Sequence, residues 1–381
     1  MVDVYNLITQ LQQVGPDFVQ NFCVINGNIW PLEHIEKMGL NEYSARTIYS
    51  MPMKFYKYFD DKEDFSKDNK TKKVNHSIEA LISNEVFLNN PSAFDDVFDS
   101  EICVPWADFE AHRIKTYAQW CKCDCTPEMS TEDTANAFLM CLYETVQNDN
   151  TIESAFDVEG QEELVKLQVS LFSKRILYEK KKVNDWGIVL KNVLTEEYNR
   201  FTQDLQQMFR VACFTTTPMS QLMWGGYANE HKGFCLEYTV STDKEYEDIL
   251  HNIRPVIYCK TRRPVTAALL ESYDHNLSME ALNDIYFNGV LRKSIDWAYQ
   301  NEWRLLLPPQ EHRQKGYLKK FFPITKVYLG NRMLPKRRKE IIAICKRKGI
   351  PYIGVTRSTD LFEMQECKEL CENCPRLNDE K

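Results

Sequence analysis

A long stretch with helical periodicity separates two strand-rich parts of this sequence. Between Asp108 and Met208, a span of about a hundred residues, apolar side chains such as Phe138, Leu142 and Val146 recur at four-residue spacing. Short runs rich in aromatic and β-branched residues lie on both sides of it. We therefore predict an α+β fold, in which a mixed or antiparallel sheet core is interrupted by a helical insertion.

The same patterns give the boundaries of the predicted parts. These are an N-terminal extension over residues 1–52, a first part of the core over 53–107, the insertion over 108–208, a second part of the core over 209–358, and an acidic, cysteine-containing tail over 359–381. The predicted strands are Met53–Phe59, Val86–Leu88, Val211–Thr215, Phe234–Val240, Val256–Cys259, Glu302–Leu307 and Ile324–Leu329. The predicted helices outside the insertion are Ile78–Asn84, with Ser77 as N-cap, Ala281–Ile295 and Lys336–Lys348.

Composition and cysteine usage restrict the class of protein. Hydrophobic residues make up 43% and charged residues 27% of the chain, which is typical of a globular protein. The thirteen cysteines are an odd number, and the residues after Met1 lack the basic and apolar regions of a signal peptide. The longest uncharged run, Val211–Asn229, contains Pro218 and several polar residues, so it is not expected to cross a membrane. We expect a reduced, cytoplasmic protein.

Motifs that identify common nucleotide-binding and hydrolytic sites are absent. The sequence contains no GxGxxG, GxxxxGK[ST], HExxH or GxSxG pattern. Two cysteine clusters offer three thiolates each, one short of a closed zinc site, and neither has the paired CxxC spacing. They are Cys121, Cys123 and Cys125, and Cys367, Cys371 and Cys374. Free thiols are the favoured interpretation, and bound zinc is the alternative.

Basic residues concentrate near the end of a chain whose formal net charge is −8. Arg332–Lys348 carries eight Lys or Arg residues and a single carboxylate, Glu340. One interpretation is contact with nucleic-acid phosphates through Lys336, Arg337 and Arg338. The other interpretation is a solvated helix face.

Four segments stand out by their order and spacing. They are Phe55-Tyr56-Lys57-Tyr58, the turn Phe87–Asp96, the segment Met223–Glu237, and Lys293 with Tyr299–Arg304. Together, and with a later Val-Tyr-Leu-Gly at Val327–Gly330, they resemble the uncharacterised, mainly bacterial family called domain of unknown function 2971. The resemblance covers residues 54–330 apart from the insertion, and it implies a fold but no established reaction. The chain departs from the usual residues of the family at Asp95, Val97, Gly226 and Gln300.

The last of these segments carries residues suited to catalysis. If Tyr299–Leu305 is a strand, Gln300, Glu302 and Arg304 share one face. The Gln-x-Glu pair is similar to a motif of ADP-ribosyltransferases, which implies that Glu302 holds the nicotinamide ribose of NAD and that Gln300 engages the acceptor. A fixed carboxylate there stabilises the oxocarbenium-like transition state of glycosidic bond cleavage. The alternative is a structural ion pair between Glu302 and Arg304.

Further candidate residues for NAD binding lie in two other segments. The resemblance to the transferases implies that Tyr56 and Lys57 contact the adenosine ribose or pyrophosphate, with Lys57 as a point charge. Trp224 and Tyr227 are expected to form a stacking wall for nicotinamide, with His231 as a polar group beside it. The alternatives are tyrosines buried in the core and a histidine that caps a turn. The enzyme interpretation requires these side chains to share one cavity with the catalytic pair.

Three hypotheses for the function follow. The first is an NAD-consuming, ADP-ribosyltransferase-like effector, with a role in bacterial anti-phage defence or a toxin system implied by the family resemblance alone. The second is a nucleic-acid-associated binding or interaction module that performs no NAD chemistry and uses residues 332–348. The third is an interaction protein stabilised by zinc.

Overall fold

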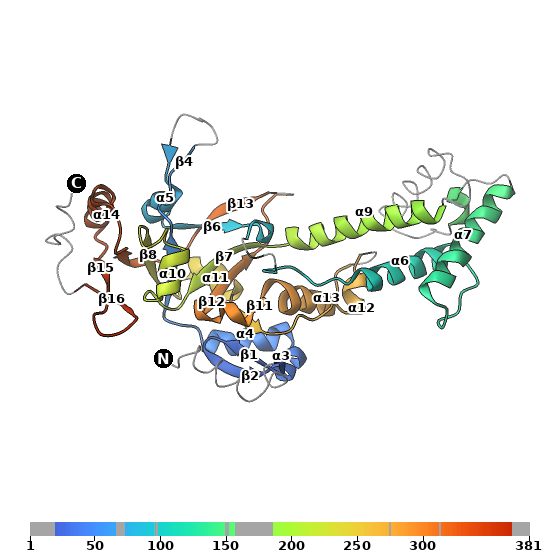
Figure 1. The fold of residues 1–381 in the computed structure, drawn as a ribbon, viewed down its shortest axis with the longest axis horizontal. Helices are drawn as coiled ribbons and strands as arrows, with labels where there is room; N and C mark the ends of the chain where they lie inside the picture. Colours follow the sequence, from blue (N-terminus) through green and yellow to red (C-terminus); the bar gives the residue numbers. More distant parts are fainter. Residues whose placement is uncertain are drawn as a thin grey trace. The chain divides into compact units, whose positions relative to one another are not determined.

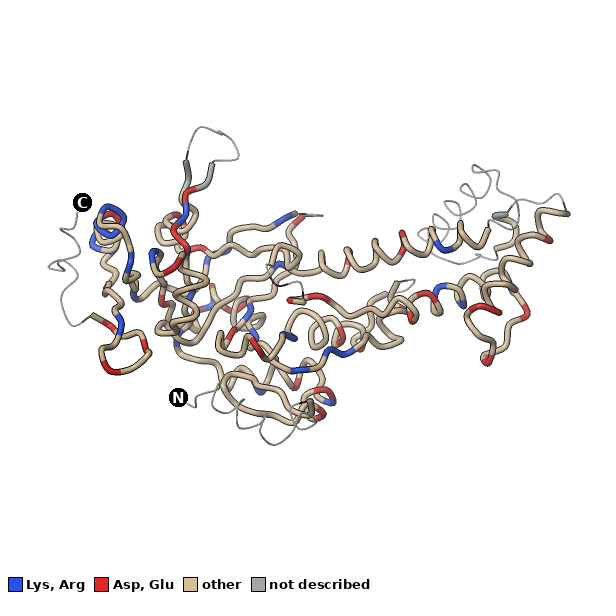
Figure 2. Tube along the Cα trace, in the orientation of Figure 1, with Lys and Arg blue, Asp and Glu red and all other residues tan. Residues whose placement is uncertain are grey.

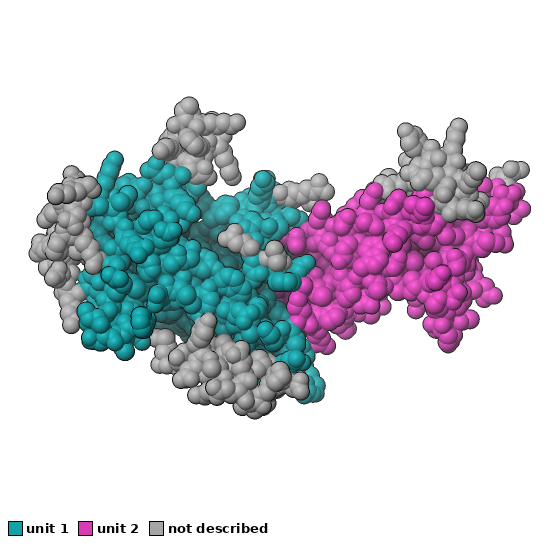
Figure 3. Space-filling model, in the orientation of Figure 1, with its two compact units in different colours: residues 1–101, 207–261, 290–381 teal, residues 102–206, 262–289 magenta. Residues whose placement is uncertain are grey.

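The structure, a computed structural model, describes residues 20–65, 73–94, 96, 98–148, 152–156, 186–273, 276–311 and 314–367. The chain divides into two units, coloured teal and magenta in Figure 3. Unit 1 consists of residues 1–101, 207–261 and 290–381, and unit 2 consists of residues 102–206 and 262–289. The stretch predicted as a helical insertion, 108–208, therefore belongs almost entirely to unit 2, which also takes a second segment from later in the chain.

Unit 1 contains a large sheet (Figure 1). Among the described residues its strand order is β13-β6-β7-β3-β8-β14-β15-β16, and β12 pairs with both β7 and β9. These strands are β3 (Lys54–Phe59), β6 (Glu85–Asn89), β7 (Arg210–Thr215), β8 (Phe234–Thr239), β9 (Ile253–Pro255), β12 (Glu302–Leu307), β13 (Gly316–Lys320), β14 (Ile324–Leu329), β15 (Tyr352–Arg357) and β16 (Met364–Glu366). Only β14 and β15 pair in parallel within this sheet, as far as it is described. The mixed sheet and the accompanying helices confirm the predicted α+β fold.

The two faces of this sheet differ because side chains alternate along each strand. On one face, Phe55 packs in an apolar core with Phe214 and Trp303. Helices α5 (His76–Ser83), α11 (Glu247–Asn252) and α14 (Pro335–Lys348) add buried apolar side chains to this core. On the other face, Tyr56 and Tyr58 pack in a smaller cluster with residues of α10 (Gln221–Gly226). The second face carries the candidate site described below.

A smaller, four-stranded sheet belongs to the same unit. Its order is β11-β10-β1-β2, formed by β11 (Arg292–Ser294), β10 (Ile257–Cys259), β1 (Phe22–Ile25) and β2 (Asn28–Pro31). Strand β1 pairs with β10, so residues 22–31, which fall within the N-terminal extension predicted over residues 1–52, are part of a sheet of unit 1. Helices α3 (Leu32–Lys37) and α4 (Leu40–Tyr49) follow, and the Tyr43 hydroxyl donates to the Pro255 carbonyl at 2.9 Å.

Unit 2 is helical in its described residues. Its main helices are α6 (Trp106–Trp120), α7 (Thr131–Gln147), α9 (Trp186–Gln207), α12 (Ala267–Glu271) and α13 (Met279–Asp284). Arg113 and Glu197 form a buried ion pair at 3.1 Å, and the Tyr117 hydroxyl donates to the same carboxylate at 2.5 Å. Residues 149–151 and 157–185 of the predicted insertion, which include the leucines Leu164, Leu167 and Leu171 at helical spacing, lie outside the described residues.

Three predicted features of helices and strands need correction: the end of one helix, the N-cap of another and the start of one strand. The helix predicted over Ala281–Ile295 is wrong beyond Asp284, because a π-helical turn over Ile285–Val290 and then strand β11 follow. Helix α5 is capped by Asn75, whose side-chain oxygen accepts from the Ile78 amide at 2.9 Å, and not by Ser77. Tyr299 and Gln300, predicted to begin a strand that runs to Leu305, belong instead to a 3-10 helix over Ile295–Gln300. These features depend on backbone turns that an apolar repeat does not reveal.

The long uncharged run Val211–Asn229 folds into β7, a connecting loop and α10. Much of it is buried, and Trp224 is fully so. Within the part of the chain that the structure describes, no helix is long and apolar enough to cross a membrane.

Candidate functional site

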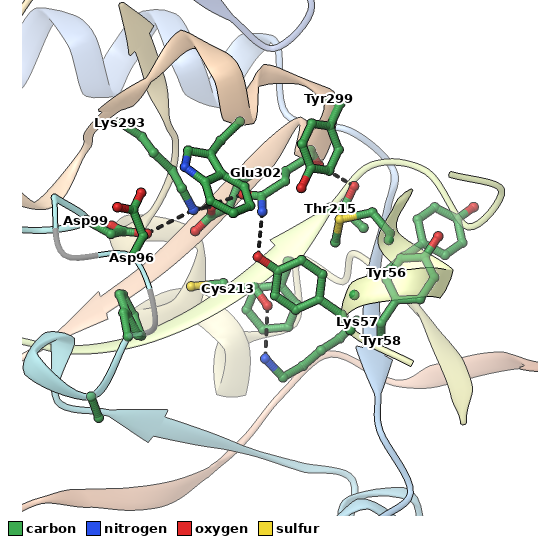
Figure 4. Close-up of a pocket in the computed structure, with 18 residues that line it drawn as sticks. Tyr56, Lys57, Tyr58, Asp96, Asp99, Cys213, Thr215, Lys293, Tyr299 and Glu302 are labelled. Atoms are coloured by element: carbon green, nitrogen blue, oxygen red, sulfur yellow. Dashed lines mark hydrogen bonds and ion pairs between the residues drawn. The ribbon is translucent and has the colours of Figure 1, made fainter. Parts of the chain in front are cut away.

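A cavity of about 560 Å³ opens on the face of the large sheet that carries Tyr56 (Figure 4). We call it the sheet cavity. Its walls come from β3, β7, α10, the start of β12 and the turn before β12. Its volume lies within the roughly 300–1,000 Å³ of typical small-molecule sites. Aromatic side chains supply much of the lining, namely Tyr56, Tyr58, Phe94, Phe214, Tyr227, Trp297 and Tyr299.

Strand register brings three of the lining residues into one row. Strand β7 pairs with both β3 and β12, and its Thr215 lies opposite Tyr56 on one strand and Glu302 on the other. Directly opposed residues of neighbouring strands point to the same face of a sheet. A predicted cofactor residue, Tyr56, and the predicted catalytic residue, Glu302, therefore share one face of one sheet.

Strands β3 and β7 separate beyond this row, and the Lys57 side chain extends from β3 toward β7. Strands β3 and β7 are paired only at Tyr56 and Thr215. Further along β7, the Cys213 carbonyl accepts a hydrogen bond from Lys57 Nζ at 3.0 Å (Figure 4). Burial lowers the pKa of Lys57. This amine has no ion-pair partner among the described residues, so it can pair with an anionic group of a ligand in the sheet cavity.

A buried network of two cations and two carboxylates forms the floor of the sheet cavity. Lys293 Nζ lies 2.8 Å from Asp99 Oδ2 and 2.9 Å from Glu302 Oε2. Arg304 Nε lies 2.7 Å from Glu302 Oε1, and Arg304 Nη2 lies 2.6 Å from Asp99 Oδ1. None of the four side chains is more than 6% exposed. The ion pair between Glu302 and Arg304 thus exists, and Glu302 also lines the cavity.

This network keeps Glu302 ionised. Burial alone raises the pKa of a carboxyl group, but the charges of Arg304 and Lys293 outweigh burial and hold the pKa of Glu302 well below its usual value. Burial also lowers the pKa of Lys293, yet Glu302 and Asp99 raise it above its usual value. A desolvated but charged carboxylate therefore faces the sheet cavity at neutral pH.

Gln300 is placed by a turn and not by the predicted strand. It ends the 3-10 helix Ile295–Gln300, and the next residue, Asn301, has a left-handed φ of 42°. Strand β12 begins only at Glu302, so the alternation predicted over Tyr299–Leu305 is wrong before that residue. With the left-handed Asn301 between them, the side chains of Gln300 and Glu302 nevertheless both line the sheet cavity.

Lys293 and Tyr227 hold the two ends of the Gln300 amide. The amide oxygen accepts a hydrogen bond from Lys293 Nζ at 2.9 Å, and the amide nitrogen donates to the Tyr227 hydroxyl at 2.6 Å. Burial raises the pKa of Tyr227 to about 12, so its hydroxyl keeps its proton at neutral pH. The two predicted catalytic residues, Gln300 and Glu302, are thus joined through one ammonium group.

Sequence reasoning assigned no role to three residues of the site: Lys293, Asp99 and Trp297. Lys293 belongs to one of the segments that carry the family resemblance, which was the available signal for it. Asp99 lies in the stretch Glu85–Glu110, which contains seven acidic residues and no Lys or Arg. The cations that pair with Asp99, Lys293 and Arg304, therefore come from a distant part of the sequence. Trp297, whose ring centroid is 5.3 Å from Lys293 Nζ, carried no signal in the sequence.

Two residues predicted to contact NAD lie outside the sheet cavity. The indole nitrogen of the fully buried Trp224 donates to the Pro218 carbonyl at 2.8 Å, and its ring meets Tyr58 edge-on, so it supports the wall from behind. His231 ends a run of three residues with positive φ, Asn229–His231, and lines a different cavity. The structure therefore does not bring Trp224 and His231 into the sheet cavity with the other predicted residues, and other aromatic side chains line it.

The residues predicted to contact nucleic acid lie at the start of α14, along which Lys and Arg gather (Figure 2). Arg338 is only 2% exposed and donates to the Gly330 carbonyl at 2.6 Å, so its predicted role at a surface is wrong. Arg337 is surrounded by three carboxylates at 2.5 to 3.0 Å. Lys336 is exposed. The segment therefore offers less free positive charge than its sequence indicates.

The cysteine clusters are only partly described, because Cys371 and Cys374 lie outside the described residues. Cys121, Cys123 and Cys125 form no disulfide bond among the described residues. Over the described ranges, no group of three or more His, Cys, Asp or Glu side chains is arranged to hold a metal ion.

Comparison with known proteins finds one family model that matches part of the chain. Residues 223–305 match the model of a family described as Protein of unknown function (DUF2971). The match includes Tyr227, Lys293, Gln300 and Glu302, and it confirms the resemblance to this family over these residues. No curated protein and no solved structure matches the chain.

Proposed function

We propose that this protein consumes NAD in the sheet cavity as an ADP-ribosyltransferase-like enzyme, acting as an effector in bacterial anti-phage defence or a toxin system. One observation carries the proposal. Residues picked from separate parts of the sequence for this chemistry, Tyr56, Lys57, Tyr227, Gln300 and Glu302, all line the same cavity. The biological context rests on the family resemblance.

The lining suits the parts of a dinucleotide. Tyr227, Trp297 and Tyr299 present apolar aromatic surface against which a nicotinamide ring can pack. Lys57 supplies a cation for the pyrophosphate, as a point charge and without the planar fork of arginine. Glu302 uses one hydrogen bond per carboxylate oxygen within the network, so lone pairs remain to accept from ribose hydroxyls.

In the proposed reaction, the bond between the nicotinamide nitrogen and ribose C1′ breaks, and its electron pair leaves with nicotinamide. Positive charge develops on the ribose, and the ionised Glu302 stabilises it more strongly in the transition state than in bound NAD. An oxygen or nitrogen of the acceptor, or water, then bonds to C1′ and releases its proton to solvent. Gln300, oriented by Lys293 and Tyr227, hydrogen-bonds the acceptor in this scheme.

The proposal is tested by following nicotinamide release and ADP-ribose transfer with the purified protein. We expect turnover by the wild type and a loss of about a hundredfold or more in Glu302→Gln, because the transition-state charge loses its counter-ion. Glu197→Gln is a matched control, since Glu197 is also a buried carboxylate paired with an arginine but lies in unit 2. A wild-type protein that neither cleaves NAD nor transfers ADP-ribose, or a Glu302→Gln variant with full turnover, refutes the proposal.

The alternative of a nucleic-acid module acting through α14 has no specific observation in its favour. Arg338 is buried, and the guanidinium of Arg337 is already surrounded by carboxylates. We therefore do not propose it.

A further inference from the structure

A second cavity of unit 1, of about 840 Å³, takes no part in the proposed reaction. We call it the loop cavity. It lies among the turn that ends at His231, the residues that follow β14, and the connection from β15 to β16. Polar side chains dominate its lining and include His231, Arg332, Thr356, Arg357, Ser358 and Thr359.

Three basic side chains meet at the loop cavity. Arg332 and Arg357 are exposed residues, and neither forms an ion pair with a carboxylate among the described residues. His231 is half-buried, and burial together with both guanidinium charges lowers the pKa of its imidazole. The His231 carbonyl accepts a hydrogen bond from the Arg332 amide at 2.9 Å, which links two of the three residues through the backbone. The positive charge of the two arginines is thus directed at one cavity.

The backbone conformation around His231 is constrained by a left-handed turn and by a close contact with Gly330. Asn229, Glu230 and His231 have φ values of 46°, 55° and 70°, in the left-handed region that non-glycine residues seldom adopt. A Cβ atom on Gly330 would lie 2.2 Å from the His231 carbonyl oxygen, so only glycine permits this close approach. The imidazole lies nearly parallel to the ring of Trp224, with centroids 6.4 Å apart. The backbone at this end of the loop cavity is therefore constrained, and the His231 ring packs against Trp224.

The carboxylates near the loop cavity do not neutralise the arginines. Asp360 and Glu363 also line it, and Asp360 accepts a hydrogen bond from the Thr359 hydroxyl at 3.1 Å. Glu230 is close enough to Arg332 for its pKa to respond, but it forms its ion pair with Lys232 at 2.9 Å. An anionic ligand would therefore meet guanidinium groups that are still free to bind it.

We propose that the loop cavity binds the phosphate groups of a nucleotide, independently of the reaction proposed for the sheet cavity. Guanidinium groups bind phosphate oxygens through paired, charge-assisted hydrogen bonds, and the neighbouring hydroxyls add further donors. Phe362 and Leu361 also line the loop cavity and are 99% and 62% exposed. An exposed aromatic ring beside a phosphate site is suited to stack on a base, which favours a nucleotide over a simple phosphate ester.

Calorimetric titration of the full-length protein tests this site with three probes: inorganic pyrophosphate, ADP and a short oligouridylate. We expect saturable binding of pyrophosphate and ADP, weakened about tenfold or more in Arg332→Gln and in Arg357→Gln, since each removes a charge-assisted contact. Lys339→Gln is the matched control, because Lys339 is an exposed lysine of α14 that does not line the loop cavity. Phe362→Ala should weaken ADP binding and leave pyrophosphate binding unchanged.

The outcomes separate this site from the sheet cavity. Lys57→Gln, which removes the amine proposed to contact the pyrophosphate of NAD in the sheet cavity, should leave the arginine-sensitive binding of pyrophosphate unchanged. The two arginine variants should leave NAD cleavage unchanged. Tighter binding of the oligouridylate than of ADP would identify a nucleic-acid strand as the source of the phosphates, and the reverse order would identify a free nucleotide; both support the site. Absence of saturable binding by every probe at millimolar concentration, or binding that is insensitive to both arginine variants, overturns the proposal.

Discussion

Glu302 is both desolvated and charged, and this combination depends on its two cationic neighbours. Arg304 and Lys293 each bond one of its oxygens, at 2.7 and 2.9 Å. A carboxylate in such a place is costly unless it is paired, and removing one partner of a buried pair typically costs about 3–5 kcal/mol. The residue proposed to perform the chemistry is therefore also part of what holds β12 in place.

The pH dependence of stability should report this ionised state. The folded-state pKa of Glu302 is lowered, so its contribution to stability is fully present above its unfolded-state pKa of about 4.3 and is lost as the pH falls toward the folded-state value. Glu302→Gln should lower the free energy of unfolding by about 3–5 kcal/mol at neutral pH. Urea titrations should show this difference from the wild type narrowing below about pH 4. A difference that stays constant as the pH falls further below that value would contradict the ionised state.

Tyr227 allows the proposed chemistry to be tested with little disturbance of the fold. It is 40% exposed, and its hydroxyl accepts the Gln300 amide at 2.6 Å. Tyr227→Phe should change the free energy of unfolding by about 1 kcal/mol or less. It should lower kcat for NAD cleavage by about tenfold or more, because Gln300 loses the partner that orients it.

A matched control for Tyr227 is available on β13. The Tyr317 hydroxyl also makes an exposed hydrogen bond, to the Pro308 carbonyl at 3.0 Å, but Tyr317 does not line the sheet cavity. Tyr317→Phe should retain the kcat of the wild type. Equal kcat values for the two variants would remove the positioning role of Tyr227.

At the scale of elements, helix α10 and its connection to β8 contribute to both cavities. Met223 and Tyr227 line the sheet cavity, and Gln221 and His231 line the loop cavity. Gly233 ends this connection where it passes over β3, and a Cβ atom there would lie 1.9 Å from the Phe59 carbonyl oxygen. This close contact gives a physical reason for the glycine that ends the segment His231-Lys232-Gly233.

Replacing Gly233 should therefore damage the fold more than replacing another glycine of the same segment. Gly233→Ala forces the connection away from β3, and we expect a loss of about 1–3 kcal/mol or more in the free energy of unfolding. Gly225 has no atom within 4 Å of an added Cβ and lies inside α10, so Gly225→Ala should be neutral or stabilising by up to about 1 kcal/mol. Thermal or urea unfolding of both variants measures the difference. Equal stabilities would mean that the close approach at Gly233 is not needed.

At the scale of the whole molecule, the sequence predicted the architecture better than the site. The bounds of β12 and β14 agree with the predicted strands, because apolar, aromatic and β-branched residues predominate in both short segments. Gln300 and Glu302 were found by their spacing, yet the turn between them depends on the positive φ of Asn301. Alternation alone could not predict that conformation.

Residues that meet only through long-range pairing could not be inferred from local patterns. Lys293 reaches Glu302 because β11 pairs with β10, and Asp99 approaches from a turn far away in the sequence. His231 was assigned to the wrong cavity because the left-handed turn before it redirects its side chain. The assignment of residues 262–289 to unit 2 also depends on long-range contacts. Local patterns did not predict it, since the short helices α12 and α13 resemble connections within the core.

All the residues proposed for NAD chemistry lie in unit 1, so the claim that the sheet cavity is the NAD site can be tested directly by a crystal structure with a bound analogue. A carbocyclic NAD, in which a methylene group replaces the ring oxygen of the nicotinamide ribose, resists cleavage and keeps both ribose hydroxyls. The expected result is a hydrogen bond from a ribose hydroxyl to the Glu302 carboxylate, with nicotinamide against the aromatic wall and the pyrophosphate beside Lys57. An analogue bound only in the loop cavity, or a sheet cavity that stays empty at saturating concentration, would contradict the proposed function.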